Sequence, residues 1–176
     1  MSETSKKHKS ESPARLRFAV FTCSTSRYNK SKLNEKIEDA SGDLIEKLLK
    51  NAGNMITQRD LITDDSDVIS KSMKKVLASS EIDAAVFSGG TGIAPSDVTI
   101  EAVLPLLEKT LPGFGEIFRR LSFDEIGSSA LLSRALAGVA KGKAFFCLPG
   151  SPNAVRLCME KLVLPEASHI VKHSRE

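Results

Sequence analysis

The chain has 176 residues, of which 41% are hydrophobic and 27% are charged, and its formal net charge at pH 7 is +3. This length and apolar content predict one globular domain with a substantial core and exclude a chain that is disordered throughout. The weak positive charge, one tyrosine and no tryptophan give neither a basic face nor a base-stacking platform, so we expect no nucleic-acid partner.

The N-terminal residues differ in composition from the rest of the chain. Residues 1–14 are rich in lysine, serine and glutamate and lack the apolar segment of a signal peptide. We interpret them as a mobile tail that precedes a single domain spanning residues 15–176. No later run is long and apolar enough to cross a bilayer, so no membrane partner is expected.

Cysteine usage indicates the redox compartment. Cys23, Cys147 and Cys158 lie far apart inside apolar runs and show none of the close pairing typical of zinc ligands. Three such residues favour buried thiols in a reducing environment, and we therefore expect a cytoplasmic location.

The first hundred residues alternate between strand and helix patterns. Short apolar runs predict buried strands at 16–23 and 82–87, and residues 55–62 predict a further strand. Apolar residues at helical spacing predict one helix around 44–49, ended by Gly53, and another over 66–77, capped within 64–66. The segment 24–38, which follows the first strand, is predicted to be a long polar loop.

This alternation predicts an α/β fold with a parallel sheet, right-handed crossovers and helices on both faces. Ligands of such sheets bind beyond the carboxyl ends of the strands. The loops that carry Ser24, Asp64 and residues 89–97 all follow strands. We therefore expect these loops to meet at one edge of the sheet.

The second half of the chain is less regular. Residues 99–104 predict a short helix that Pro105 ends, and 112–116 predict a turn before a helical segment at 117–121. Residues 128–136 are a further helix candidate. A strand at 143–148 leads into the turn 149–152, after which Pro152 suits the first turn of a helix.

The most informative stretch is the glycine-rich turn 88–92 (Ser-Gly-Gly-Thr-Gly) with Asp97 shortly after it. Glycines let backbone N–H groups converge on a phosphate, and a following helix N-terminus adds positive potential. The carboxylate of Asp97 offers an oxygen ligand for Mg²⁺. A simple strand-to-helix turn also fits this pattern, because neither a Walker A lysine nor the full GxGxxG spacing is present.

Five stretches in a fixed order give a more specific signal: 39–42 (Asp-Ala-Ser-Gly), 88–92 with 96–99 (Ser-Asp-Val-Thr), 112–116 (Pro-Gly-Phe-Gly-Glu), 132–134 (Leu-Ser-Arg) and 148–152 (Leu-Pro-Gly-Ser-Pro). Together they resemble the molybdopterin adenylyltransferase family of the MogA/MoaB type, which includes the gephyrin and plant Cnx G domains. The resemblance implies a three-layer α/β/α sandwich with a mostly parallel sheet, the molybdopterin-binding fold. It also implies assembly as a homo-oligomer, either a trimer or a hexamer.

The reaction that the resemblance implies is a step of molybdenum cofactor biosynthesis. Mg-ATP donates AMP to the terminal phosphate of molybdopterin and releases pyrophosphate. Such a transfer depends on neutralising charge and aligning the reactants, and the attacking phosphate is already ionised, so no general base is needed.

Matched residue by residue, the resemblance makes Asp64 and Asp97 the catalytic carboxylates and the ligands of Mg²⁺. It implies that substrate and phosphate groups contact Ser88, Gly89, Gly90, Thr91, Gly92, Ser133, Arg134, Pro149, Gly150 and Ser151. Two positions depart from the family. Ser96 stands where many relatives carry a basic residue, and Thr25 lies in a segment where relatives often carry aspartate.

Structural alternatives remain for individual residues. Asp64 and Asp97 each also suit a helix N-cap, Arg134 suits a helix surface, and Asp39 and Ser41 are interpreted as caps rather than substrate ligands. At the level of function, the alternative is a carrier that binds molybdopterin without adenylylating it. An oligomeric scaffold is a third possibility. Retention of Asp64 and Asp97 favours the enzyme.

Overall fold

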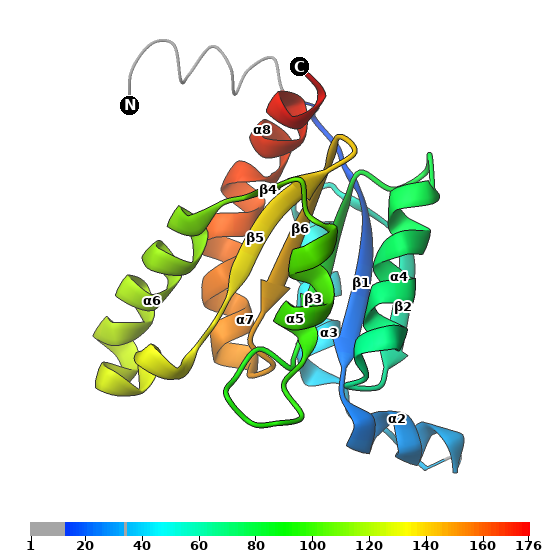
Figure 1. Cartoon of the computed structure of the whole chain (residues 1–176), viewed down its shortest axis with the longest axis vertical. Helices are drawn as coiled ribbons and strands as arrows, with labels where there is room; N and C mark the ends of the chain where they lie inside the picture. The colour runs from blue at the N-terminus through cyan, green and yellow to red at the C-terminus, as the bar shows by residue number, and fades with distance from the viewer. Residues whose placement is uncertain (1–12, 34) are drawn as a thin grey trace.

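The computed structural model describes residues 13–33 and 35–176, and Figure 1 shows its fold. The predicted tail at 1–14 lies outside the described residues as far as position 12. Within the described part, six strands form one sheet in the order β2-β1-β3-β6-β5-β4. The strands are β1 (Arg17–Cys23), β2 (Met55–Ile62), β3 (Ala84–Ser88), β4 (Lys109–Thr110), β5 (Leu136–Ala140) and β6 (Lys143–Leu148).

Helices pack on both faces of this sheet (Figure 1). They are α2 (Thr25–Lys32), α3 (Ala40–Asn51), α4 (Ser66–Ala78), α5 (Thr99–Val103), α6 (Pro112–Ile126), α7 (Pro152–Cys158) and α8 (Leu164–Arg175). Short segments of other helix types lie at Leu104–Leu106, Gly127–Leu132 and Met159–Val163. No helix in the described part is long and apolar enough to cross a membrane.

The core is split into two layers by the sheet. On one face, Phe18 and Val20 of β1 pack with α3, α6, α7 and α8. On the other face, Phe21 of β1 stacks on Phe87 of β3 with ring centroids 4.7 Å apart, and α4 and α5 cover them. Fully burying a large apolar side chain contributes about 1.5–3 kcal/mol, so these two layers account for most of the driving force of folding. The predicted three-layer α/β/α sandwich is confirmed.

Strand direction follows from the connections. β2, β1, β3 and β6 run parallel, whereas β5 is antiparallel to both β6 and β4. The helical crossovers produce the parallel part, and a tight turn at Lys141 and Gly142, both with positive φ, produces the β5–β6 hairpin. The sheet is therefore mostly parallel, as predicted, with an antiparallel edge.

The three cysteines are buried, as predicted. Burial raises the pKa of the Cys23 thiol to about 12 and raises the pKa values of Cys147 and Cys158 as well. Because the thiolate is the reactive form, these residues are inert packing groups at neutral pH.

The predicted loop 24–38 was wrong in its first half, where α2 forms. Ser24 caps this helix, and its hydroxyl accepts a hydrogen bond from the backbone N–H of Arg27. None of the residues of α2 is buried, so the helix carries no apolar periodicity by which the sequence could reveal it.

The segment 128–136 was wrongly predicted as an α-helix. Its first part is the 3-10 turn Gly127–Leu132, and Leu136 begins β5. β5 contains only Leu, Ala, Gly and Val, a composition with weak strand propensity. Gly138 is needed there because a Cβ would lie 2.6 Å from the carbonyl oxygen of Lys109 on β4.

The turn predicted at 112–116 is instead the first turn of α6. Pro112 occupies a first-turn position, where its missing N–H costs nothing. Gly115 lets this helix approach β5 closely, because a Cβ at that position would lie 2.6 Å from the Ala135 carbonyl oxygen. Gly115 therefore serves helix packing rather than a turn.

Candidate functional site

The carboxyl ends of the four parallel strands gather the loops that the sequence singled out. Ser24 follows β1 and donates its N–H to the Ile62 carbonyl at the end of β2, at 2.9 Å. Gly89 follows β3 and donates its N–H to the Leu148 carbonyl at the end of β6, at 3.0 Å. The predicted convergence of these loops at one edge is therefore confirmed.

The glycine turn has a conformation that side chains could not adopt. Gly89 and Gly90 have φ values of 107° and 63°. A Cβ on Gly89 would lie 2.3 Å from the Cys23 carbonyl oxygen, and one on Gly90 would lie 2.4 Å from Thr99 Oγ1. Thr99 fastens the turn, because its hydroxyl donates to the Gly89 carbonyl at 2.8 Å and its N–H donates to the Gly90 carbonyl at 3.0 Å.

Asp97 closes the loop that follows the glycines. Its carboxylate accepts a hydrogen bond from the N–H of Ala94 at 2.8 Å, and its own N–H donates to the Ala94 carbonyl at 2.8 Å. A Cβ on Gly92 would lie 2.7 Å from Asp97 Oδ2, so the carboxylate lies directly against the glycine turn. Asp97 is not a helix cap, because α5 begins at Thr99 without a side-chain cap.

Asp64 lies on the other side of the same turn. The alternative that it caps α4 is wrong, because Asp65 is the N-cap and accepts from the Val68 N–H at 2.9 Å. The Asp64 carboxylate instead accepts the N–H of Thr25 at 2.7 Å, and a Cβ on Gly90 would lie 3.3 Å from its Oδ1. The two predicted carboxylates thus flank the glycine turn, one at Gly90 and one at Gly92.

Arg134 holds the loop 92–97, which carries Asp97, through its guanidinium group. Its Nε donates to the Gly92 carbonyl at 2.7 Å and its Nη2 donates to the Asp97 carbonyl at 3.0 Å. The guanidinium also pairs with Glu101, and this hydrogen bond holds the pKa of the Glu101 carboxyl below its usual range. These bonds use most of the five donors, so Arg134 fixes the loop that carries Asp97 rather than lying on a helix surface.

A cavity of about 420 Å³ opens beside the glycine turn. It is lined by Gly89, Gly90, Thr91, Gly92, Asp97, Ser129, Leu132, Ser133, Pro149 and Gly150. Most of the residues that the resemblance assigned to substrate therefore share one cavity. Asp64 touches the turn from outside this lining, and Ser88 is fully buried, with its hydroxyl 3.4 Å from the Pro149 carbonyl.

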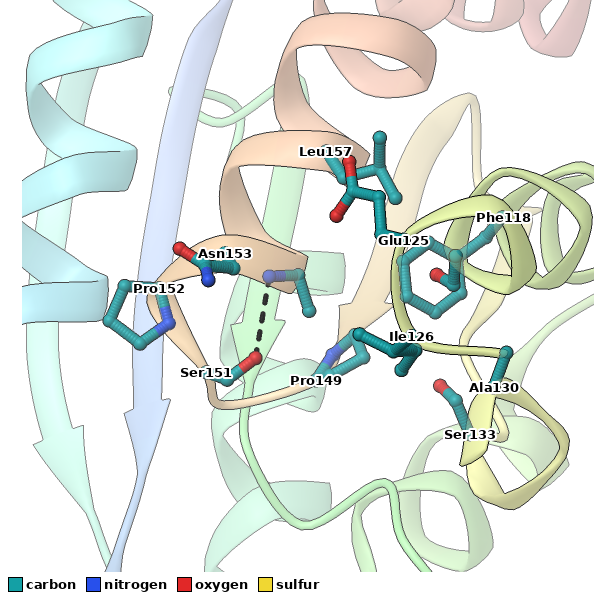
Figure 2. A pocket seen from close by; sticks show the side chains of 12 residues that line it. Phe118, Glu125, Ile126, Ala130, Ser133, Pro149, Ser151, Pro152, Asn153 and Leu157 are labelled. Atoms are coloured by element: carbon teal, nitrogen blue, oxygen red, sulfur yellow. Dashed lines mark hydrogen bonds between the residues drawn. The ribbon is translucent and has the colours of Figure 1, made fainter. Parts of the chain in front are cut away.

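A second cavity of about 360 Å³ adjoins the first, and both have Ser133 and Pro149 in their walls (Figure 2). Its lining is largely apolar and includes Phe118, Ile126 and Leu157. The hydroxyl oxygen of Ser133 is buried without a hydrogen-bond partner in the described structure. An unpartnered buried hydroxyl costs about 1–3 kcal/mol, which a bound polar ligand would recover.

The turn after β6 is held in place by a residue that sequence reasoning misjudged. Ser41 was interpreted as a helix cap, but Asp39 is the cap of α3, and the buried Ser41 hydroxyl donates to the Gly150 carbonyl at 2.6 Å. Ser151 caps α7 by accepting the Ala154 N–H at 3.3 Å and also lines the second cavity (Figure 2). Sequence reasoning also missed Phe118 and Asn153 in this lining, because neither stands next to a motif.

The side chains available as ligands determine which metal ions this site can bind. No group of three or more His, Cys, Asp or Glu side chains within residues 13–33 and 35–176 is arranged to hold an ion. The two carboxylates beside the glycine turn, Asp64 and Asp97, are oxygen ligands. Mg²⁺ is usually bound by one or two carboxylates together with substrate phosphates and water, so these residues fit it.

Comparison with known proteins identifies the family. The family described as "Probable molybdopterin binding domain" matches residues 19–169. The chain belongs to this molybdopterin-binding family. The match covers the whole of the sheet except the first strand's start, and it includes both flanking carboxylates and the two cavities.

Named members of the molybdopterin-binding family cover almost the whole chain. "Molybdenum cofactor biosynthesis protein B" of Bacillus subtilis (strain 168) is 44% identical over 170 residues, which are 96% of each chain. "Probable molybdopterin adenylyltransferase" of Methanocaldococcus jannaschii is 42% identical over 92% of this chain and 95% of its own length.

Solved structures of the molybdopterin-binding family share the fold. A crystal structure of molybdenum cofactor biosynthesis protein B matches with a TM-score of 0.84 at 42% identity, covering 94% of this chain and 99% of that one. The tungsten cofactor synthesizing protein MoaB from Pyrococcus furiosus matches with a TM-score of 0.77 at 36% identity, covering 93% and 99%. The resemblance drawn from the five sequence stretches is confirmed.

Proposed function

We propose that this chain is an enzyme of molybdenum cofactor biosynthesis that transfers AMP from Mg-ATP to the terminal phosphate of molybdopterin. The observation that carries the proposal is the placement of Asp64 and Asp97 on either side of a glycine turn that lines a cavity. The relative named as a probable molybdopterin adenylyltransferase, 42% identical over 92% of this chain, supports this reaction.

The reaction requires an oxygen of the terminal phosphate to attack the α-phosphorus of ATP, while the bond from that phosphorus to the β-phosphate oxygen breaks. Pyrophosphate leaves with the bonding electron pair. Both reactants are anionic, so the main tasks of the protein are to align them and to offset their charge. The turn 89–92 supports the alignment, because it lines the cavity and three of its four residues are glycines, so a phosphate can approach its backbone closely.

Asp64 and Asp97 are the residues that would hold Mg²⁺, which when bound neutralises charge on the phosphate oxygens. The contacts of these carboxylates keep them in place. Thr25 fixes Asp64 through a backbone N–H, and Ala94 fixes Asp97 in the same way. A carboxylate whose position is set before substrate binds loses little free energy to reorganisation during the reaction.

The second cavity, beside the one that the glycine turn lines, suits a planar ring. Its apolar walls offer stacking and contact area, and the unpartnered Ser133 hydroxyl offers a polar contact at the boundary between the two cavities. A substrate with a ring system and an attached phosphate would span both spaces. Both molybdopterin and ATP have this form.

We further infer that the chain acts in the cytoplasm as a homo-oligomer, a trimer or a hexamer. Five large apolar side chains of α6 and the turn after it are exposed, which supports a protein interface there: Ile117, Phe123, Ile126, Leu131 and Leu132. The three buried, unpaired thiols are compatible with a reducing compartment. Analytical ultracentrifugation tests the assembly, and a monomer at micromolar concentration would contradict it.

Pyrophosphate release from Mg-ATP, with and without molybdopterin, tests the proposed reaction. We expect turnover by the parent chain and a loss of at least about 10²-fold in Asp64→Asn and Asp97→Asn, because each removes a carboxylate that would hold Mg²⁺ against the phosphates. Asp65→Asn is the matched control: it changes a neighbouring carboxylate to a residue that still caps α4, and it should retain activity.

The outcome also separates the enzyme from the carrier. A parent chain that binds molybdopterin but releases no pyrophosphate would overturn the proposed reaction and leave a carrier. Equal activity in all three variants would show that the two carboxylates beside the glycine turn are not part of the site.

A further inference from the structure

The second cavity has neighbouring cavities on two sides. It shares Ser133 and Pro149 with the first cavity, which the glycine turn lines. It shares Glu125, Asn153 and Leu157 with a smaller cavity of about 200 Å³. Figure 2 shows the Glu125 side chain reaching from α6 toward Leu157 on α7, with Ser133 at the other end of the cavity. Glu125 therefore lies at the end of the second cavity that is away from the glycine turn.

Glu125 brings an unpaired carboxylate to this largely apolar wall. In the part of the chain that the structure describes, no hydrogen bond or ion pair engages its oxygens. The neighbouring carboxylate, Asp124, pairs instead with Arg120 and does not line the cavity. The buried Ser133 hydroxyl at the other end also lacks a partner. The second cavity thus has two polar groups, one at each end, that are available to a ligand.

The chemistry of a carboxylate restricts which ring edge Glu125 can bind. An ionised carboxylate accepts hydrogen bonds and donates none, and its two oxygens can accept from two adjacent N–H groups at once. A 2-amino-4-oxopyrimidine ring offers such a pair, the ring N–H and the amino N–H beside it. Adenine offers an amino N–H beside a ring nitrogen with a lone pair, which a carboxylate repels. Glu125 therefore favours the edge found in pterins and in guanine over that of adenine.

The position of Glu125 also matches the shape of one proposed substrate. In molybdopterin, the phosphate is attached on the pyrazine side of the ring system, and the 2-amino edge lies on the opposite side. A molybdopterin whose phosphate occupies the first cavity would pass Ser133 and turn its 2-amino edge toward Glu125. The faces of the ring would contact Phe118 and Ile126, which supply apolar area.

We propose that Glu125 recognises the 2-amino edge of a pterin, so that the second cavity holds the ring of molybdopterin rather than the adenine of ATP. This inference rests on the proposed function and specifies where one of its two substrates binds. Ser133 contacts the part of the ligand that joins the ring to its phosphate. Changing Glu125 should accordingly weaken the binding of pterins and leave the binding of adenine nucleotides unchanged.

Isothermal titration of the full chain with 6-hydroxymethylpterin phosphate, without ATP, tests the recognition. The matched ligand is the corresponding lumazine phosphate, in which an oxo group replaces the 2-amino group. We expect the parent to prefer the pterin by at least about tenfold, and Glu125→Gln to lose at least about tenfold in affinity for it. The affinity for the lumazine should not fall, because the glutamine amide can donate to the new oxo group. Asp124→Asn is the control and should bind both ligands like the parent.

Nucleotides distinguish the two sources of the 2-amino edge. GMP presents this edge on guanine and should bind more weakly than the pterin phosphate, while the affinity for AMP should be the same in the parent and in Glu125→Gln. In the pyrophosphate assay, Glu125→Gln should raise KM for molybdopterin at least about tenfold and leave KM for ATP unchanged.

Several results would overturn the assignment of Glu125. They are a parent that does not bind the pterin phosphate, equal pterin affinity in the parent and Glu125→Gln, equal affinity of the parent for pterin and lumazine, or tighter binding of GMP than of the pterin. Binding is measured without ATP, so the proposed reaction is tested separately. A parent that binds the pterin through Glu125 but releases no pyrophosphate would overturn the reaction and support the recognition.

Discussion

Thr25 and Asp64 exchange two hydrogen bonds across the ends of β1 and β2. The Thr25 N–H donates to Asp64 Oδ2 at 2.7 Å, and the Asp64 N–H donates to Thr25 Oγ1 at 2.9 Å. The first residue of α2 thereby sets the position of a carboxylate that lies against Gly90. Thr25, one of the two departures from the family, thus makes two hydrogen bonds with Asp64.

Thr25→Val tests this pairing. Valine keeps the backbone N–H but removes the acceptor for the Asp64 N–H, a hydrogen bond worth about 1 kcal/mol. We expect kcat/KM for pyrophosphate release to fall about fivefold, with little change in the free energy of unfolding because Thr25 is exposed. Thr25→Ser restores the hydroxyl and should recover most of the activity. Equal kinetics for the valine and serine variants would contradict the role of the hydroxyl.

Gly92→Ala should change the position of the Asp97 carboxylate without changing the stability of the fold. The backbone of Gly92 is outside the positive-φ region, and the nearest atom to an added Cβ is Asp97 Oδ2 at 2.7 Å. We expect the methyl group to displace the carboxylate and lower turnover at least about tenfold, while the free energy of unfolding changes by less than about 1 kcal/mol.

Two further glycine variants serve as controls for the activity and stability of Gly92→Ala. Gly113→Ala meets no atom within 4 Å and should keep both activity and stability. Gly89→Ala combines a φ of 107° with a clash at 2.3 Å against the Cys23 carbonyl oxygen, so it should destabilise the fold. Urea unfolding measures stability, and a Gly92→Ala chain as unstable as Gly89→Ala would refute the expected separation.

Arg134→Lys tests the support of the Asp97 loop. A lysine ammonium cannot reproduce the two bonds to the Gly92 and Asp97 carbonyls in the fixed geometry of a guanidinium. A misplacement of about 1 Å in a reacting group costs about 10²-fold in rate, and we expect a loss of this order in kcat. Arg120→Lys, on an exposed arginine that pairs with Asp124, is the control and should behave like the parent.

Asp83 gives a prediction about stability and pH. Its carboxylate is 8% exposed and accepts hydrogen bonds from Arg17 and Arg175 at the opposite edge of the sheet. Burial alone would raise its pKa, but the bonds from the two arginines outweigh this and hold the pKa well below its usual range. Because the folded pKa is depressed, this stabilisation is complete above the unfolded pKa of about 3.9 and is lost as pH falls below it.

Asp83→Asn should therefore lower the free energy of unfolding at pH 7 by about 1.5–3 kcal/mol, the range for hydrogen bonds to a charged group. The difference from the parent should shrink as pH falls below about 4, because the carboxylate then protonates in the unfolded parent while it stays ionised in the folded one. Urea unfolding at several pH values measures both effects, with Asp124→Asn, an exposed surface partner, expected to change stability by less than about 1 kcal/mol. A difference that stays constant down to pH 2 would argue against the charged network.

Local patterns were sufficient wherever an element buries a continuous apolar face. The strands β1, β3 and β6 and the helices α3 and α4 follow from runs and periodicities that the packing of a two-layered core requires. The edge strand β2, in which only Ile62 is buried, was also predicted. The same reasoning failed for α2, which buries nothing, and for β5, whose alanines and glycine favour no particular strand. The formation of α2 and β5 therefore depends on contacts with neighbouring elements.

The sequence by itself determined the parallel α/β architecture and the glycine turn at the end of β3, because short-range spacing encodes both. The two carboxylates were singled out by the resemblance to the family. Only the tertiary structure decided what these groups do to one another. It places Arg134 on the Gly92 carbonyl across 42 positions, Ser41 on the Gly150 carbonyl across 109, and Thr25 on Asp64 across 39. Such bonds depend on which strand ends meet at one edge of the sheet. The spacing of two residues along the chain does not indicate whether they lie close together in the fold.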